Sequence, residues 1–279
     1  MTKMLKRELE KVLTTDEIHQ IYSSFDIIGD IAIIKIPEPL LDKKYIIAET
    51  ILNKIKSIKT VLRQSTSVSG EYRTRDLEYI SGDDKTLTLY KEYGCIFKVD
   101  VAKVYFSPRL STERARIAKK VKSGETIINM FAGVGSFSII IAKNQPESKI
   151  FSIDLNPYAY DLMVENIKLN KVVDRVIPFL GDAKSVIEDS LKGFGDRVLM
   201  PLPEKAIDYM DIAISALKPK GGIIHYYTHI HAPKGEDPIK EAEKEVKSSL
   251  KVPYKISETR VVREVGPRWN QLVLDLVIV

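Results

Sequence analysis

The chain has 279 residues, 44% of them hydrophobic, and a net charge of +5, which is an ordinary composition for a globular protein of one large domain or two. Its apolar runs are shorter than the roughly 18 residues that a membrane span needs, and no secretory leader opens it, so we expect a cytoplasmic protein without a membrane segment. The single cysteine, Cys95, excludes an internal disulfide, and we expect it to be a buried small hydrophobe in a reducing compartment.

Residues 1–105 predict a small α+β domain. A short polar helix is expected first, followed by the strand-like run "IIGDIAIIKI", a helix over about 42–57 and the run "KTVLRQ". The stretch "TLTLYKEYGCIFKVDVAKVYF" then predicts a hairpin that turns at Tyr93 and Gly94.

Residues 106–279 predict a doubly wound α/β domain. From Glu125 onward, strand-like runs alternate five times with helical patterns, which is typical of a parallel sheet with helices on both faces. Two strand runs, "YKISETRVVREV" and "NQLVLDLVIV", close the chain and predict an antiparallel hairpin. A Rossmann-like sheet that ends in such a hairpin is the class I methyltransferase arrangement, although periodicity alone does not establish the strand order.

A basic segment occupies the predicted junction between the two domains, residues 106–124. The twelve residues "STERARIAKKVK" hold five Lys/Arg against one Glu, and so carry most of the net charge. A run of this kind is either a solvated helix face or a helix that contacts phosphates. Clefts at domain junctions often bind substrates, which favours neither interpretation by itself.

The stretch "INMFAGVGSFSI" places Gly133 and Gly135 directly after a predicted strand. Glycines at this turn let the backbone pass close to a ligand and adopt positive φ. Asp154 follows 21 residues after Gly133, at the end of the second strand of the series, where a carboxylate can accept both hydroxyls of a ribose. The pattern predicts a nucleoside-containing cofactor in preference to a structural tight turn.

Two features favour S-adenosylmethionine over NAD. The dinucleotide fingerprint needs a third glycine three residues after the second, to bring a helix under the pyrophosphate, and that position is Ser138. Asp182 ends the third strand, where it can accept from the exocyclic amine of an adenine. Each acid alone is equally suited to be a helix N-cap, and the cofactor prediction depends on the acids together with the loop.

Several long motifs carry a resemblance to a known family: "GEYRTRDLE", "VDVAKVYFSPRLSTERARI", "MFAGVGSFSI", "IDLNPYAYDLMVENIKLNKV" and "GGIIHYYTH". From about Phe25 to the last strand, the chain resembles the archaeal and eukaryotic tRNA (guanine-37-N1)-methyltransferases, including their archaeal wyosine-pathway branch. The resemblance implies methyl transfer from S-adenosylmethionine to the guanosine 3′ of the anticodon. It implies the tRNA anticodon arm as partner, and we expect the protein to act as a monomer.

The resemblance also implies roles for individual residues. Glu113 would be the general base on guanine N1, and Arg73 would stabilise charge on O6, since methylation at N1 requires both. Cofactor contacts would come from Phe131, Ala132, Gly133, Val134, Gly135, Asp154, Leu155, Asp182, Ala183 and Pro201, and tRNA contacts from Arg109, Arg114, Arg116, Lys119, Lys120, Tyr72 and Pro203. No metal site is expected.

Local alternatives exist for both catalytic candidates. Glu113 can be a first-turn acid stabilised by the helix dipole, after Ser111 or Thr112 as N-cap. Arg73 can form a surface ion pair with an acid of its own segment, Glu71 or Asp76.

The chain departs from the family pattern at two positions. Pro201 replaces the Asn of an Asn-Leu-Pro motif that helps to hold the target base, and Asn129 replaces a common acid at the end of the first strand of the series. We also expect no room before Phe25 for the extra N-terminal domain of longer members. Methylation of guanosine 37, methylation of a tricyclic wyosine precursor at the same position, and aminocarboxypropyl transfer therefore remain open, as does a tRNA-binding module without activity.

Overall fold

The computed structural model describes residues 2–22, 25–66 and 70–279. It divides into two compact units, residues 1–109 and 110–279. The predicted domain boundary at residue 105 lies shortly before this division, which assigns the predicted junction segment partly to each unit. Among the helices of the described residues, none combines the length and apolarity that a membrane crossing requires.

The first unit combines a four-stranded sheet with helices, as predicted. Its sheet has the order β1-β2-β3-β4, with β2 and β3 parallel and the outer pairs antiparallel. The strands are β1 (Asp26–Ile28), β2 (Ile31–Ile34), β3 (Thr60–Gln64) and β4 (Leu77–Gly82); the helices are α1 (Thr2–Leu9), α2 (Thr15–Gln20), η1 (Glu38–Lys43) and α3 (Lys44–Lys54). An apolar core that includes Ile34, Leu40, Ile51 and Val61 joins the sheet to the helices.

The hairpin predicted at Tyr93 and Gly94 is confirmed. Strands β5 (Leu87–Glu92) and β6 (Cys95–Asp100) pair antiparallel, with Glu92 opposite Cys95. The two turn residues have φ values of 46° and 74°, the left-handed conformation that a two-residue hairpin turn requires and that Gly adopts readily. Cys95, the first residue of β6, is buried, as expected.

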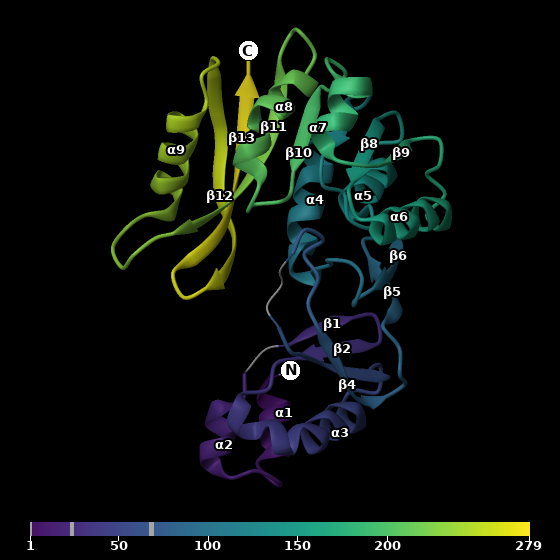
Figure 1. Cartoon of the computed structure of the whole chain (residues 1–279), viewed down its shortest axis with the longest axis vertical. Coiled ribbons are helices and arrows are strands. Elements are labelled where there is room, and N and C mark those ends of the chain that lie inside the picture. Colours follow the sequence, from purple (N-terminus) through teal and green to yellow (C-terminus); the bar gives the residue numbers. More distant parts are fainter. Residues whose placement is uncertain (1, 23–24, 67–69) are drawn as a thin grey trace. The chain divides into compact units, whose positions relative to one another are not determined.

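The second unit is the predicted doubly wound α/β domain. Its seven-stranded sheet has the order β12-β13-β11-β10-β7-β8-β9, which Figure 1 shows from β12 to β9. The five strands that alternate with helices are parallel, and β13 is antiparallel to both of its neighbours. The strands are β7 (Thr126–Asn129), β8 (Lys149–Asp154), β9 (Val176–Leu180), β10 (Arg197–Met200), β11 (Gly222–His231), β12 (Tyr254–Gly266) and β13 (Trp269–Ile278).

Helices of the second unit connect and cover these strands. They are η2 (Pro108–Leu110, at the division between the units), α4 (Ser111–Lys120), α5 (Ser136–Asn144), α6 (Pro157–Leu169), α7 (Ala183–Val186), η3 (Ile187–Leu191), η4 (Ala206–Tyr209), α8 (Met210–Ala216) and α9 (Pro238–Ser249). An apolar cluster joins α7, α8 and α9 to one face of the sheet, through residues such as Ile224, Leu274 and Leu276. Because β7 lies centrally and its neighbours connect in opposite directions, the carboxyl end of β7 is the switch point where such folds bind ligands.

Candidate active site

The glycine turn after β7 has the conformation that its sequence predicts. Gly133 and Gly135 have φ values of 56° and 84°, and Gly135 is the N-cap of α5. A Cβ at Gly135 would lie 3.0 Å from Met163 Cγ, so both the backbone angle and the space favour glycine. The loop is held from below by buried Asn166, whose Nδ2 donates to Val134 O at 3.1 Å.

The two predicted acids lie at the same carboxyl edge of the sheet. Asp154 ends β8, and its carboxylate accepts from Gly133 N at 2.5 Å and Asn156 N at 3.0 Å. Burial raises the pKa of Asp154, while these two backbone donors oppose that shift. Asp182 is the N-cap of α7, where it accepts from the amides of Lys184 and Ser185, and its second oxygen accepts from Tyr209 Oη at 2.6 Å.

The remaining predicted cofactor residues lie close in sequence to the glycine turn, to the two acids or to the end of β10. Phe131 is partly buried and packs edge-on against Tyr209, with 5.2 Å between ring centroids. Ala132, Val134 and Ala183 are buried, Leu155 is 38% exposed, and Pro201 follows β10 with intermediate exposure. The structure therefore brings loops from β7, β8, β9 and β10 to one edge of the sheet.

A buried polar cluster lies under the glycine loop. Asn129 Nδ2 donates to Ser138 Oγ at 3.0 Å, and Ser152 Oγ lies 2.7 Å from the same hydroxyl. Asn129 is fully buried, and no described donor lies within hydrogen-bond reach of its Oδ1. An orphaned buried acceptor is costly unless a ligand or water satisfies it. The cluster thus fits a cofactor that carries a hydrogen-bond donor.

Glu113 projects from the first turn of α4 and is fully buried. Its Oε1 accepts from Tyr227 Oη at 2.7 Å and from Arg116 Nη2 at 2.8 Å, and its Oε2 accepts from Arg116 Nε at 3.0 Å. Arg260 Nη1 of β12 lies 3.4 Å from Oε2. Neither Ser111 nor Thr112 is the N-cap, because α4 begins at Ser111 after Leu110 and no side chain caps it.

The pKa values of Tyr227 and Arg116 are both raised, so both side chains stay protonated and donate to Glu113. Burial, together with the neighbouring Glu113 carboxylate, raises the pKa of Tyr227 well above its ordinary value, so the phenol stays protonated and donates. Burial alone would lower the pKa of Arg116, but hydrogen bonds to Asp275 and Glu113 outweigh it and raise that pKa. The carboxylate of Glu113 is therefore held between permanent donors.

The basic segment separates into buried and exposed side chains. Arg114 is 2% exposed, and Arg116 is committed to carboxylates within the unit. Both side chains therefore offer little free surface for the predicted phosphate contacts, which stay a prediction for these two residues. Lys119 is exposed, and Lys120 is partly exposed and paired with Glu258 and Asp275.

In the first unit, Arg73 lies in a turn with an unusual backbone. Its φ is 53°, and its guanidinium lies over the ring of Tyr105, 4.4 Å from the centroid. Positive φ at a non-glycine residue costs free energy and often marks a functional position. Tyr72 beside it is 42% exposed, and Arg109 donates from Nε to Asp26 Oδ1 at 2.9 Å while remaining half exposed.

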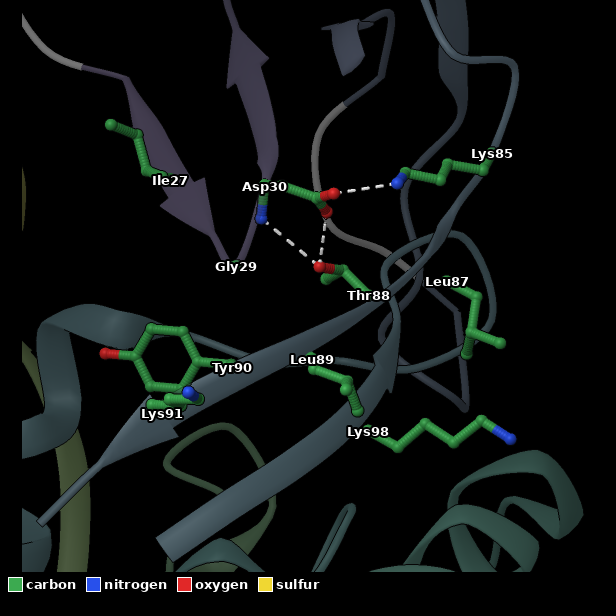
Figure 2. A pocket seen from close by; sticks show the side chains of 10 residues that line it. All are labelled: Ile27, Gly29, Asp30, Lys85, Leu87, Thr88, Leu89, Tyr90, Lys91 and Lys98. Carbon is green, nitrogen blue, oxygen red and sulfur yellow. Dashed lines mark hydrogen bonds and ion pairs between the residues drawn. The ribbon is translucent and has the colours of Figure 1, made fainter. Parts of the chain in front are cut away.

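A separate hollow of about 750 Å³ lies within the first unit, between the β1–β2 turn and the β5–β6 hairpin. Figure 2 shows Asp30 between Lys85 and Thr88, with ion-pair and hydrogen-bond distances of 2.7 Å each. Exposed Leu87 and Leu89 form part of its wall. None of the predicted site residues lines this hollow, so the switch point of the second unit remains the candidate site.

Sequence reasoning missed several residues of the site. Tyr227 and His225 lie in the motif "GGIIHYYTH" but were given no role, and Asp275 and Arg260 were not singled out. Strand alternation was a signal for His225 and Asp275, because polar residues within the otherwise apolar strands β11 and β13 indicate a buried polar face. Among the described residues, no group of three or more His, Cys, Asp or Glu is arranged to hold a metal ion.

Comparison with known families and proteins agrees with this geometry. Residues 88–253 match the model of the TRM5/TYW2 methyltransferase domain, and residues 5–86 match that of the TYW2 N-terminal domain. Three relatives are similar over most of the chain. Trm5b of Pyrococcus abyssi, a tRNA (guanine(37)-N(1))-methyltransferase, is 43% identical over 91% of this chain and 74% of its own length. Taw21 of Saccharolobus solfataricus, a tRNA 4-demethylwyosine(37)-methyltransferase, is 39% identical over 92% of this chain and 94% of its own. A tRNA(Phe) (4-demethylwyosine(37)-C(7)) aminocarboxypropyltransferase of Pyrococcus horikoshii is 33% identical over 99% of this chain and 94% of its own.

Two solved structures show the same architecture. One is the complex of aTrm5 and tRNALeu, with a TM-score of 0.86 and 39% identity over 98% of this chain and 77% of that chain. The other is Methanocaldococcus jannaschii TYW2 in complex with AdoMet, with a TM-score of 0.65 and 30% identity over 91% and 98%.

The strand order and the glycine turn define a methyltransferase of the class I fold. Since the domain model covers more than half of the chain and the relatives align along nearly all of it, the protein belongs to the TRM5/TYW2 methyltransferase family.

Proposed function

We propose that the protein transfers a methyl group from S-adenosylmethionine to N1 of guanosine 37 of tRNA, next to the anticodon. The single observation that carries this proposal is the buried Glu113 carboxylate, held by Tyr227 and Arg116 in a unit that also presents the glycine turn of a class I methyltransferase. The names of relatives with this architecture support the reaction and the position on the tRNA.

Glu113 is the proposed general base. Guanine N1 carries a proton, and its lone pair belongs to the ring π system, so this proton must leave as the new bond forms. Hydrogen bonds that fix the rotamer of a carboxylate hold it in one orientation for the transfer, although each donor also stabilises its charged form. Tyr227 Oη and Arg116 leave Glu113 little freedom, and Arg260 adds a further cation beside Oε2.

Arg73 is the proposed partner for the guanine O6. As N1 loses its proton, negative charge develops on O6, and a guanidinium stabilises it. The stacking of Arg73 on Tyr105 holds the guanidinium in a defined place, which suits this role.

S-adenosylmethionine supplies an electrophilic methyl group when it is bound. The residues that would hold it are the glycine turn, Asp154 for the ribose hydroxyls and Asp182 with Phe131 for the adenine side. Asn129 Oδ1 offers a buried acceptor below the turn that the described chain does not use. Ala132, Val134, Leu155, Ala183 and Pro201 complete the proposed lining.

For the tRNA we propose contacts from Arg109, Lys119 and Lys120 with phosphates of the anticodon arm, and from Tyr72 and Pro203 near the target base. Exposed or partly exposed cations suit the phosphate role, since such contacts supply affinity and little sequence information. Pro203 is buried and forms part of the loop that follows β10.

A second candidate is methylation of a tricyclic wyosine precursor at position 37. Pro201 favours it, because a proline has neither a side-chain donor nor an N–H with which to hold a guanine edge. The similarity to Taw21 supports the same candidate.

We propose further that the protein acts as a monomer in the cytoplasm. Light scattering of the purified protein tests the monomeric state.

The deciding experiment incubates the protein with S-adenosylmethionine and two anticodon-arm RNAs, one with plain guanosine 37 and one with 4-demethylwyosine. The nucleoside products are analysed by mass spectrometry. Methyl gain on the plain RNA supports the main proposal, and methyl gain only on the tricyclic RNA supports the second. An aminocarboxypropyl gain, or binding without any product, contradicts both.

A further inference from the structure

Arg116 binds three carboxylates, of which Glu113 and Asp275 are buried and Glu258 is partly exposed. Its guanidinium faces Glu113 through Nε and Nη2, and it faces Asp275 through Nη1 at 2.7 Å and Nη2 at 3.2 Å. The side chains of Glu113 and Asp275 are 0% and 2% exposed. A single buried cation is therefore shared between the proposed base and a second acid of the sheet.

Asp275 is fixed from its other side by His225. The two residues are register partners on β13 and β11, and His225 Nδ1 lies 2.5 Å from Asp275 Oδ1. His225 Nε2 lies 2.7 Å from Arg197 Nη1, and because an arginine only donates, Nε2 must accept. His225 is consequently neutral, with its proton on Nδ1, and it donates to Asp275.

Arg197 is itself immobilised. Its Nε and Nη2 donate to the two oxygens of Glu125, at 2.9 and 3.1 Å. A continuous line of hydrogen bonds thus runs from Glu125 through Arg197, His225, Asp275 and Arg116 to Glu113. The line lies on one face of the sheet, since Arg197 and His225 occupy the alternate positions that face away from the apolar cluster.

This arrangement bears directly on the strength of a base. If a guanidinium has one carboxylate as its only partner, its full positive charge stabilises the ionised form of that carboxylate. Proton transfer to the carboxylate is then disfavoured. Asp275 draws part of the guanidinium charge to itself. Hydrogen bonds from His225 and Arg116 more than offset the burial of Asp275 and keep its pKa below the ordinary value, so it remains an anion for this purpose.

We propose that Asp275 is a positioning residue that acts through Arg116: it shares the guanidinium with Glu113 and so holds Glu113 in place as an effective base. This inference depends on the proposed role of Glu113. Charged or titratable groups that face Glu113 are Arg116 of its own helix, Tyr227 of β11 and Arg260 of β12; those that face Asp275 are Arg116, Lys120, His225 and Glu258.

The test compares Asp275→Asn with Arg116→Gln by the pH dependence of single-turnover methylation. In Asp275→Asn, Glu113 is the only buried carboxylate left on Arg116 and Glu258 stays as an outer partner, so the acid limb of the profile moves by roughly one unit to lower pH and the rate at neutral pH falls by up to about tenfold. In Arg116→Gln, the shared cation is gone and the acid limb moves to higher pH. KM for S-adenosylmethionine and for tRNA stays within about twofold in both variants, as expected when a step after binding is affected.

Two matched variants separate positioning from mere support. Asp196→Asn removes an anion that directly precedes β10 and pairs with Lys218 and Lys220, outside the line of hydrogen bonds, and should leave the profile where it is. Glu258→Gln removes a 38% exposed partner of Arg116 at 3.3 Å, and solvent screening should reduce its shift to a small fraction of that of Asp275→Asn.

The signs of the shifts decide the outcome. If Asp275→Asn and Arg116→Gln move the acid limb in the same direction, or if neither moves it, the proposal is wrong. Should Asp275→Asn not fold, Arg116→Gln still tests the shared cation, and an acid limb that does not move to higher pH contradicts the proposal. Full turnover by Glu113→Gln would remove Glu113 as the base, and this inference with it, while the proposed methyl transfer would stand; absence of any methylated product from the wild type would instead overturn the proposed function.

Discussion

The two faces of the central sheet differ in kind where β11 and β13 pair. One face presents Ile224, Leu274 and Leu276, all fully buried against α7, α8 and α9. The opposite face of the same two strands presents His225 and Asp275, which are almost equally buried. Alternate residues of one strand pair thus supply an apolar core and a charged interior.

This difference separates stability from function. Burial of the apolar face is favourable by about 25 cal/mol per Å² of apolar surface. Buried ion pairs repay their desolvation only in part, so hydrophobic replacements are often as stable or more stable. We interpret the charged face as retained for the chemistry of Glu113, and the following predictions set the two faces against each other.

The largest expected effect is that of Glu113→Gln on turnover. Glutamine keeps the size of the side chain and an acceptor for Tyr227, but it does not accept a proton at neutral pH. Methylation should fall about 100- to 10,000-fold while tRNA and cofactor affinities change little. Single-turnover kinetics and calorimetric binding measure the two quantities, and unchanged turnover would remove Glu113 from the mechanism.

Leu274→Ala should lower stability and leave turnover unchanged. Removing a fully buried leucine from the apolar face should lower the free energy of unfolding by about 2–5 kcal/mol. The folded variant should methylate at the wild-type rate. Urea unfolding gives the stability, and Leu169→Ala, at a leucine that is 47% exposed, is the matched control and should cost less than about 0.5 kcal/mol. A large loss of rate without loss of stability would contradict the division between the faces.

Asp154→Ala tests the carboxyl edge that both faces share. Loss of a charged acceptor for the ribose should weaken S-adenosylmethionine binding by about 1.5–3 kcal/mol, or roughly 10- to 100-fold. Calorimetry of the cofactor alone measures it. Asp174→Ala, at an exposed acid paired with Arg175, should bind as the wild type does, and equal affinities for all three proteins would exclude the ribose role.

The smallest effect expected is a change in the pH dependence of stability. Burial lowers the pKa of His225 below its ordinary value, so below about pH 6.5 the unfolded chain binds the extra proton and the folded chain does not. Stability should therefore fall as the pH decreases from 7 to 5.5, by at most about 1.4 kcal/mol per pH unit from this residue. His225→Asn should show a flatter profile in urea unfolding, and identical slopes would mean that His225 is not neutral in the folded state.

Local patterns in the sequence predicted much of the fold. The five strand and helix alternations, the terminal hairpin and the turn at Tyr93 and Gly94 are all confirmed, because each depends on neighbouring residues. Strand β4 was missed, since "LEYISG" lacks a clear alternation and pairs with β3 only through the tertiary fold. The hairpin of β1 and β2 was expected as one run, although Gly29 with φ of 58° turns it.

Some residues of the site were also predictable from local sequence, and others only from the tertiary fold. Gly133, Gly135 and Asp154 are recognisable from spacing alone, because a turn and a strand end set their positions within a few residues. Arg116 was expected on a basic surface, and its burial follows from Asp275, which lies 159 residues later in the chain. The charge pattern along a helix shows which positions carry basic side chains. Only the packing of distant strands decides which of these side chains are exposed to water and which pair with a buried carboxylate.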